Sequence, residues 1–107
     1  MLSIEYSNRF KESYKLAKKR GLDVSLLDSV VRQLAEGIPL DPKHKDHQLS
    51  GNYKAFRECH IQFDWVLVYR IVRNRCMLYL FDTGTHEDVF LTPIQNQLQI
   101  SISDLCG

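Results

Sequence analysis

Three histidines between residues 47 and 86 are the side chains best suited to chemistry. His47 lies in a segment rich in proline and glycine, and His60 lies near the end of a strand-like segment. His86 follows Thr83-Gly84-Thr85, just past the last strand-like segment, and Asp64 adds a carboxylate soon after His60. Imidazole titrates near neutral pH, so these residues can donate and accept protons at physiological pH. Because the ends of antiparallel strands can meet at one sheet edge, we expect a His/His/His/Asp cluster there.

Acid–base catalysis fits these residues better than a metal site does. Metal sites usually contain a local ligand pair such as His-x-His or His-x-x-x-His, whereas the nearest pair here is His44 and His47 in a loop. We therefore predict no metal and no other cofactor. Metal-free RNA cleavage needs only a base for the 2′-hydroxyl and an acid for the 5′-oxygen. Taken singly, each histidine can equally be a surface or structural residue, and we assign His44 to that class.

Two amphipathic helices are predicted before residue 38. Ser7 and Asp23 are suitable N-cap residues, and Gly21 and Gly37 are suitable stops. Apolar residues recur at helical spacing between them, namely Phe10, Tyr14 and Ala17, then Leu27, Val30, Val31 and Leu34. The short connection predicts that the helices pair antiparallel and bury these stripes in the core.

Strand patterns dominate the rest of the chain after a long loop at 38–53. Residues 55–61, 64–72 and 76–81 are rich in β-branched and aromatic residues, residues 2–6 alternate, and 73–75 form a plausible hairpin turn. We predict a single α+β domain over 1–107, with an N-terminal strand and an antiparallel helix pair packed on a small twisted antiparallel sheet. Residues 91–107 form a C-terminal extension whose structure the pattern does not decide.

Composition places the chain among ordinary globular proteins. A chain of 107 residues with 44% hydrophobic content supports one compact core. The longest apolar run, 66–72, is too short to span a membrane, and the N-terminal residues do not resemble a secretory signal. Cys59, Cys76 and Cys106 are too widely spaced for a zinc motif, and we expect Cys59 and Cys76 to be buried. These features predict a cytoplasmic protein.

Basic residues are concentrated in two regions despite a net charge of +1. Residues 9–20 contain six Lys or Arg and one Glu, residues 43–75 contain seven against three acids, and no Lys or Arg follows residue 75. Such regions suit a polyanionic partner, such as nucleic acid or an acidic protein, and are equally compatible with ordinary solvated surfaces.

A resemblance to a known toxin family adds to these inferences. The sequence from about Ile4 to Phe90 resembles the YafQ branch of the RelE/ParE toxin superfamily. The resemblance is carried by three strings, Lys45-Asp46-His47-Gln48-Leu49-x-Gly51, Phe56-Arg57-Glu58-Cys59-His60-Ile61-x-x-Asp64-Trp65-x-Leu67-Val68-Tyr69 and Thr83-Gly84-Thr85-His86-x-x-x-Phe90.

The resemblance implies a toxin of a type II toxin–antitoxin pair that cleaves messenger RNA in the ribosomal A site. It implies products with a 2′,3′-cyclic phosphate and a 5′-hydroxyl, and a cognate antitoxin as partner. His47, His60, Asp64 and His86 match the catalytic positions of the family, with His86 as the leading general acid and the others activating or orienting the 2′-hydroxyl. The predicted substrate-binding residues are Arg57, Trp65, Phe90 and Lys45, although Trp65 is equally compatible with a core aromatic and Phe90 with a residue that pins the C-terminal turn.

Asp82 departs from the family pattern. The family usually has an arginine there, facing the scissile phosphate, and loss of such a group typically lowers the rate ~10²–10³-fold. If Asp82 lies close to His86, it would raise the pKa of His86. Arg57 is the first candidate to replace the arginine, although strand alternation places it opposite His60. Two alternatives stay open: a ParE-like gyrase inhibitor, whose relatives generally lack the histidines, and an impaired toxin homologue that chiefly binds its antitoxin.

Overall fold

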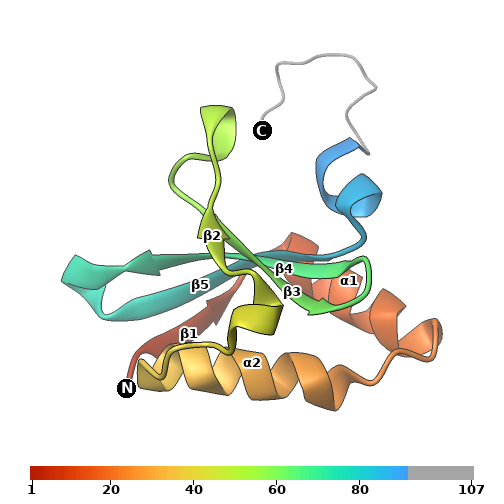
Figure 1. Cartoon of the computed structure of the whole chain (residues 1–107), viewed down its shortest axis with the longest axis horizontal. Coiled ribbons are helices and arrows are strands. Elements are labelled where there is room, and N and C mark those ends of the chain that lie inside the picture. Colours follow the sequence, from red (N-terminus) through yellow and green to blue (C-terminus); the bar gives the residue numbers. More distant parts are fainter. Residues whose placement is uncertain (92–107) are drawn as a thin grey trace.

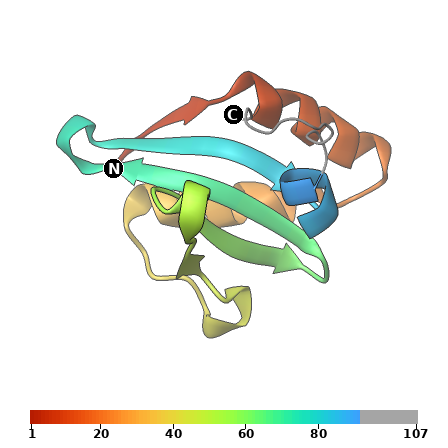
Figure 2. The ribbon, with the colours of Figure 1, turned by 90° about the horizontal axis from the view of Figure 1, so that it is seen from above.

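A mixed β-sheet covered on one face by two helices makes up the computed structural model, which describes residues 1–91. Over that range the sheet has five strands in the order β1-β5-β4-β3-β2, an order that can be followed across Figure 2. The strands are β1 (Ser3–Tyr6), β2 (His47–Gln48), β3 (Arg57–Gln62), β4 (Trp65–Val72) and β5 (Met77–Gly84). The helices are α1 (Asn8–Lys19) and α2 (Val24–Glu36); in Figure 1, α2 runs below the sheet, and α1 begins behind the sheet and descends at the right.

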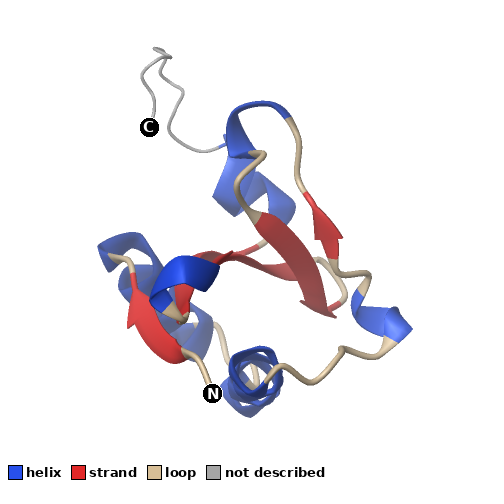
Figure 3. Cartoon of the chain, turned by 90° about the vertical axis from the view of Figure 1, so that its left-hand side faces the viewer, coloured by secondary structure: helices blue, strands red, loops and turns tan. Residues whose placement is uncertain are grey.

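The helix boundaries follow the predicted caps. The Ser7 hydroxyl accepts a hydrogen bond from the backbone N–H of Phe10, and the Asp23 carboxylate accepts one from that of Ser25. Gly37 ends α2 with a φ of 75°, in the left-handed region that favours glycine. The caps therefore confirm where the helices begin and where α2 ends, and α2 is seen nearly end-on in Figure 3.

The strands β2 to β5 pair antiparallel, as the sequence predicted, but β1 lies parallel to β5. The pairing of the first strand could not be predicted from the sequence, because its partner lies more than seventy residues away. The last strand also runs to Gly84, three residues past its predicted end at residue 81. The bulge between β4 and β5 lies where Val68 pairs with Asp82 and Tyr69 pairs with Leu80.

The two faces of the sheet have different cores. The face toward the helices carries the main core, in which Trp65, Leu67 and Tyr69 of β4 pack with both helices. The opposite face carries a smaller cluster of Val66, Val68 and Val89, with Leu49, Phe56, Phe81 and Phe90 packed against it. The four predicted catalytic residues, His47, His60, Asp64 and His86, gather on this second face.

The segment predicted as one long loop contains short ordered elements. Over residues 38–53 these are the 3-10 turns η1 (Pro42–His44) and η2 (Gly51–Tyr53) and the two-residue strand β2. The predicted turn at 73–75 is the 3-10 turn η3 (Arg73–Arg75), and after β5 the chain forms a π-helical turn, η4 (Glu87–Leu91). In Figure 1, η2 and η4 rise above the sheet, on the side opposite α1 and α2.

The expectations for Cys76 and for the C-terminal extension differ in outcome from the rest. Cys59 is buried as expected, but Cys76 is exposed, because it follows η3 at the turn between β4 and β5 with a φ of 49°. The predicted C-terminal extension lies outside the described residues from residue 92 onward. Within residues 1–91, no helix is both long enough and apolar enough to cross a membrane.

Candidate active site

A buried glutamate, Glu58, lies at the centre of the candidate site. Its carboxylate is 3.3 Å from Nε2 of His86, 3.4 Å from Nε2 of His47 and 3.7 Å from Nε2 of His60. The Glu58 side chain is only 4% exposed, whereas those of His47 and His86 are about half exposed. A carboxylate therefore lies behind three imidazoles that solvent can reach. Together with Asp64, these residues are called the Glu58 cluster.

Sheet register explains how the cluster forms from distant segments. His47 of β2 pairs directly with Glu58 of β3, and His60 follows two residues later on the same strand. Residues two apart on a strand face the same side, so Glu58 and His60 both lie on the face opposite the helices. His86 reaches this face from the turn that follows β5.

The turn that carries His86 is fixed by its two neighbours. The Thr85 hydroxyl accepts a hydrogen bond from the backbone N–H of Asp88 at 3.0 Å, and the Asp88 carboxylate accepts one from that of Thr85 at 3.1 Å. This reciprocal arrangement is a capping box at the start of the helical turn. Gly84 has a φ of 151°, and a Cβ atom there would lie 3.0 Å from Cβ of Asp88. The glycine therefore allows the close approach that orients His86.

His86 lies between two carboxylates. Its Nδ1 is 2.7 Å from Oδ1 of Asp64, which also accepts a longer hydrogen bond from the His86 backbone N–H. The hydrogen bond to Asp64 and the nearby charge of Glu58 raise the pKa of His86, although partial burial opposes them. The hydrogen bonds from His86 in turn lower the pKa of Asp64. The arrangement favours a protonated His86 that is reachable by solvent.

The remaining imidazoles have their own fixed surroundings. Nδ1 of His47 donates to the backbone carbonyl of Lys45 at 2.7 Å, an assignment that leaves Nε2 directed at Glu58. The His60 and His86 rings are 5.3 Å apart between centroids. Phe90 stacks near His86 with ring centroids 6.3 Å apart and planes inclined by 27°.

Two predicted substrate-binding residues lie away from the cluster. Arg57 contacts Asp46, whose carboxylate also accepts a hydrogen bond from the Tyr69 hydroxyl at 2.6 Å. Trp65 is 4% exposed in the helix-side core, and its indole N–H donates to the Thr83 hydroxyl at 2.9 Å. Arg57 thus faces away from His60, as strand alternation indicated, and Trp65 packs as a core aromatic.

Asp82 also lies outside the cluster, against α1. Arg9 Nε donates to one carboxylate oxygen at 2.6 Å, and the Ser13 hydroxyl and the Thr83 backbone N–H donate to the other. Asp82 is 2% exposed, so these contacts replace most of its hydration. The raised pKa of His86 comes from Asp64 and Glu58, and not from Asp82 as the sequence had suggested.

Glu58 is the residue that the sequence reasoning missed. The signal was present, because Glu58 and His60 are two apart in a predicted strand and must share a face.

The cluster also bears on the prediction that the protein has no metal site. Glu58, His60 and His86 each offer one ligand atom, and these atoms lie within 4.8 Å of one another among the described residues. Imidazole and carboxylate donors at that spacing fit a transition-metal ion.

Comparisons with known proteins match most of the chain. A family model described as a bacterial toxin of a type II toxin–antitoxin system, YafQ, matches residues 2–91. The mRNA interferase toxin YafQ of Escherichia coli K12 is 36% identical over 88 residues, which cover 81% of this chain and 94% of that protein.

Solved structures show the same fold. A metal-bound toxin from Helicobacter pylori is 46% identical, with a TM-score of 0.80 over 84% of this chain and 100% of that one. YafQ in the DinJ–YafQ complex of E. coli is 35% identical, with a TM-score of 0.77 over 84% of this chain and 99% of that one. The chain therefore belongs to the YafQ family of bacterial toxins of type II toxin–antitoxin systems.

Proposed function

We propose that this chain is an endoribonuclease that cleaves messenger RNA by acid–base catalysis at the Glu58 cluster. The observation that carries the proposal is the position of His86, held between Asp64 and Glu58 and half exposed to solvent. Relatives named mRNA interferases support the substrate class. The nucleophile in this reaction is the 2′-hydroxyl of the RNA itself, so the protein has to supply an acid and a base.

His86 acts as the general acid. Asp64 accepts the hydrogen bond from Nδ1 and so holds the ring in place, which makes the proton on Nε2 the one that is transferred. The raised pKa increases the share of His86 that is protonated at a given pH. As the P–O bond breaks, the 5′-oxygen takes this proton and leaves as a 5′-hydroxyl.

His47 acts as the general base. Its Nδ1 proton is held by the Lys45 carbonyl, so the Nε2 lone pair accepts the proton of the 2′-hydroxyl. Glu58, at 3.4 Å from Nε2, stabilises the imidazolium that forms. The 2′-oxygen then attacks phosphorus and gives a 2′,3′-cyclic phosphate.

The other cluster residues bind the substrate. His60, whose ring lies 5.3 Å from that of His86, contacts the scissile phosphate. Phe90 extends the aromatic surface beside His86, on which an unpaired base can stack. Asp82 is paired with Arg9 and does not place a negative charge in the cluster. The idea of an impaired toxin therefore rests only on the missing arginine.

The ribosome and an antitoxin are the proposed partners. The resemblance implies cleavage in the ribosomal A site, and E. coli YafQ has been solved in complex with DinJ. We propose that this chain likewise binds a cognate antitoxin. The histidines of the Glu58 cluster disfavour a purely ParE-like gyrase inhibitor, since gyrase inhibition by binding needs no acid–base groups.

A second property is favoured by the metal-binding geometry of the same residues. Glu58, His60 and His86 fit a transition-metal ion, and the H. pylori relative is described as metal-bound. We propose that such an ion, held by Glu58, His60 and His86, would inhibit this chain, because a His86 nitrogen that served as a metal ligand could not carry the proton that the acid must donate.

Induced expression in a bacterial host tests the proposed function. Primer extension on translated messengers should reveal discrete cuts within reading frames, and growth should stop. The His86→Ala and His47→Ala variants should lose the cuts while their thermal unfolding stays close to that of the wild type. Uncut messengers with inhibited supercoiling by the purified protein would support the gyrase alternative instead.

A further inference from the structure

Phe63 is an aromatic residue that the fold does not use. It occupies the tight turn between β3 and β4, is 92% exposed, and has a φ of 49°. That left-handed conformation favours Gly, Asn or Asp and strains larger side chains. The ring therefore buries almost no apolar surface at a strained position. An exposed, strained aromatic residue next to Asp64, which holds His86, is better explained by a binding role than by stability.

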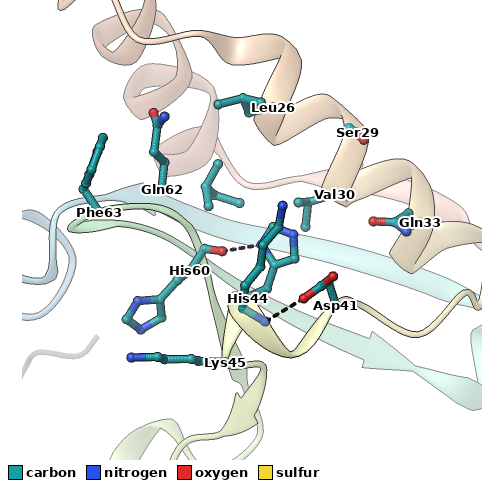
Figure 4. Close-up of a pocket in the computed structure, with 12 residues that line it drawn as sticks. Leu26, Ser29, Val30, Gln33, Asp41, His44, Lys45, His60, Gln62 and Phe63 are labelled. Carbon is teal, nitrogen blue, oxygen red and sulfur yellow. Dashed lines mark hydrogen bonds between the residues drawn. The ribbon is translucent and has the colours of Figure 1, made fainter.

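A groove begins at Phe63 and reaches the Glu58 cluster. A cavity of about 720 Å³ lies between α2, η1 and the end of β3, and Phe63, Gln62, Lys43, Lys45 and His60 are among its lining residues. Figure 4 shows Phe63 and Gln62 extending from the turn, with His60 and Lys45 extending together on the other side of the strand. We call this space the η1 groove. His60 lines the groove and lies 3.7 Å from Glu58, so the groove borders the candidate active site.

The wall of the η1 groove is ordered and basic. Nδ1 of His44 lies 2.6 Å from the backbone carbonyl of His60, which ties η1 to β3. The Asp41 carboxylate accepts a hydrogen bond from the Lys43 backbone N–H and caps η1. Lys43 and Lys45 are exposed, so their ammonium groups are available to an anionic ligand. A cavity of this size accommodates a nucleotide-sized ligand.

We propose that the η1 groove binds the RNA chain flanking the scissile phosphate, with a base stacked on Phe63 and phosphates contacted by Lys43 and Lys45. The inference rests on the proposed RNA cleavage and adds a substrate subsite to it. RNA is favoured over a protein occupant because an aromatic platform beside cations, continuous with acid–base groups, is the arrangement that binds unpaired nucleic acid. Stacking is tolerant of base identity, so Phe63 supplies affinity more than sequence preference.

Cleavage kinetics on ribosomes carrying messenger RNA test the subsite. Single-turnover rates are measured against toxin concentration, which separates the half-saturating concentration from the maximal rate. Phe63→Ala should raise the half-saturating concentration about tenfold, the equivalent of one lost base stack, and Phe63→Tyr should restore it. The maximal rate should change little. Tyr6→Ala, an exposed aromatic on β1 at the far side of the sheet, is the matched control and should behave as the wild type.

Further variants separate the loss of a contact to RNA from a loss of protein stability and from a general effect of charge. Phe63→Gly should bind RNA as weakly as Phe63→Ala but unfold at the same or a higher temperature, because glycine suits a φ of 49°. Lys43→Gln and Lys45→Gln should each reduce the salt dependence of the half-saturating concentration by about one unit of slope. Arg75→Gln, at the opposite hairpin, is the control for charge and should leave the slope unchanged.

The outcomes separate this inference from the proposed function. Suppose that the wild type cleaves and that Phe63→Ala and Lys43→Gln have half-saturating concentrations within twofold of the wild-type value. This result would overturn the subsite and leave the proposed nuclease activity intact. Weakened antitoxin binding by Phe63→Ala without any change toward RNA would also overturn it. If the wild type does not cleave, the proposed function fails, and Phe63→Trp then tests the subsite alone. Its fluorescence should be quenched by a free oligoribonucleotide, and absence of quenching would refute RNA stacking.

Discussion

Replacement of Glu58 by glutamine probes the feature that organises the whole site. The substitution keeps the shape of the side chain and removes one negative charge that lies 3.3–3.7 Å from three imidazole nitrogens. At an effective dielectric constant of about 20, a charge pair 3.3 Å apart interacts by roughly 5 kcal/mol before screening. His47 and His86 are half exposed, so solvent reduces this to about 1–2 kcal/mol for each imidazolium.

Catalysis by the Glu58→Gln variant should fall by ~10²–10³, because the imidazolium that His47 forms in the reaction loses its anionic partner. The pKa of His86 should move down toward its ordinary value, since Glu58 is one of the groups that raise it. Cleavage rates across pH and NMR titration of the His86 ring measure both effects, with Glu36→Gln on the surface of α2 as the matched control.

Stability should depend on pH in a defined direction. Because the pKa of His86 is raised on folding, its stabilising contribution is complete below the pKa of the unfolded chain and is lost as pH rises through the folded value. The thermal unfolding temperature of the wild type should therefore fall with rising pH in that window. The unfolding temperature of Glu58→Gln should depend less on pH. Unchanged cleavage together with an unchanged His86 titration in Glu58→Gln would refute the role assigned to Glu58.

Further predictions concern the residues around the cluster. Asp64→Asn should lower the pKa of His86 and move the alkaline limb of the pH–rate profile to lower pH; an unmoved limb would count against His86 as the acid. Asp82→Ala should reduce the free energy of unfolding by about 1–3 kcal/mol in denaturant titrations, because it leaves the Arg9 Nε–H, the Ser13 hydroxyl and the buried Thr83 N–H without their acceptor. Asp82→Arg should destabilise the fold more, through repulsion by Arg9, and a stable variant would contradict the pairing. Trp65→Phe should cost about 1 kcal/mol through loss of the indole hydrogen bond yet retain cleavage, and loss of cleavage in a folded protein would restore Trp65 to the site. Copper or zinc salts at low concentration should inhibit the wild type reversibly, with recovery upon addition of a transition-metal chelator; calorimetric binding of the ion by His86→Ala with the affinity of the wild type would place the ion elsewhere.

Local signals in the sequence predicted the local structure well. Ser7 and Asp23 cap their helices as expected, because capping depends on residues only two or three positions apart. The parallel pairing of β1 with β5 was not predictable, since it joins residues more than seventy positions apart and no local pattern encodes it. The short elements within 38–53 were missed for a similar reason, as β2 is only two residues long and exists through its pairing with β3.

The sequence predicted part of the site and missed the part that depends on tertiary packing. His47, His60, Asp64 and His86 do gather at one place, where strand ends and their following turns meet. Glu58 was overlooked because a carboxylate in a strand is ordinarily solvated, and its burial follows from tertiary packing.

Asp82 shows how a residue type can mislead without its environment. Its charge suggested an effect on the reacting phosphate, whereas the structure directs it into a buried pair with Arg9 of α1. The β4–β5 bulge lies at this point of the sheet, and a bulge that redirects a side chain leaves no reliable mark in a single sequence.

The central claim is that the cluster cleaves RNA through the 2′-hydroxyl, and a single atom in the substrate tests it most directly. Ribosomes are programmed with a messenger that carries one 2′-deoxynucleotide immediately 5′ to the mapped cut, alongside the all-ribose messenger. The account predicts cleavage of the all-ribose messenger to a 2′,3′-cyclic phosphate end, identified by mass spectrometry, and no cleavage at the deoxynucleotide. Equal cleavage of both messengers at that position would contradict it.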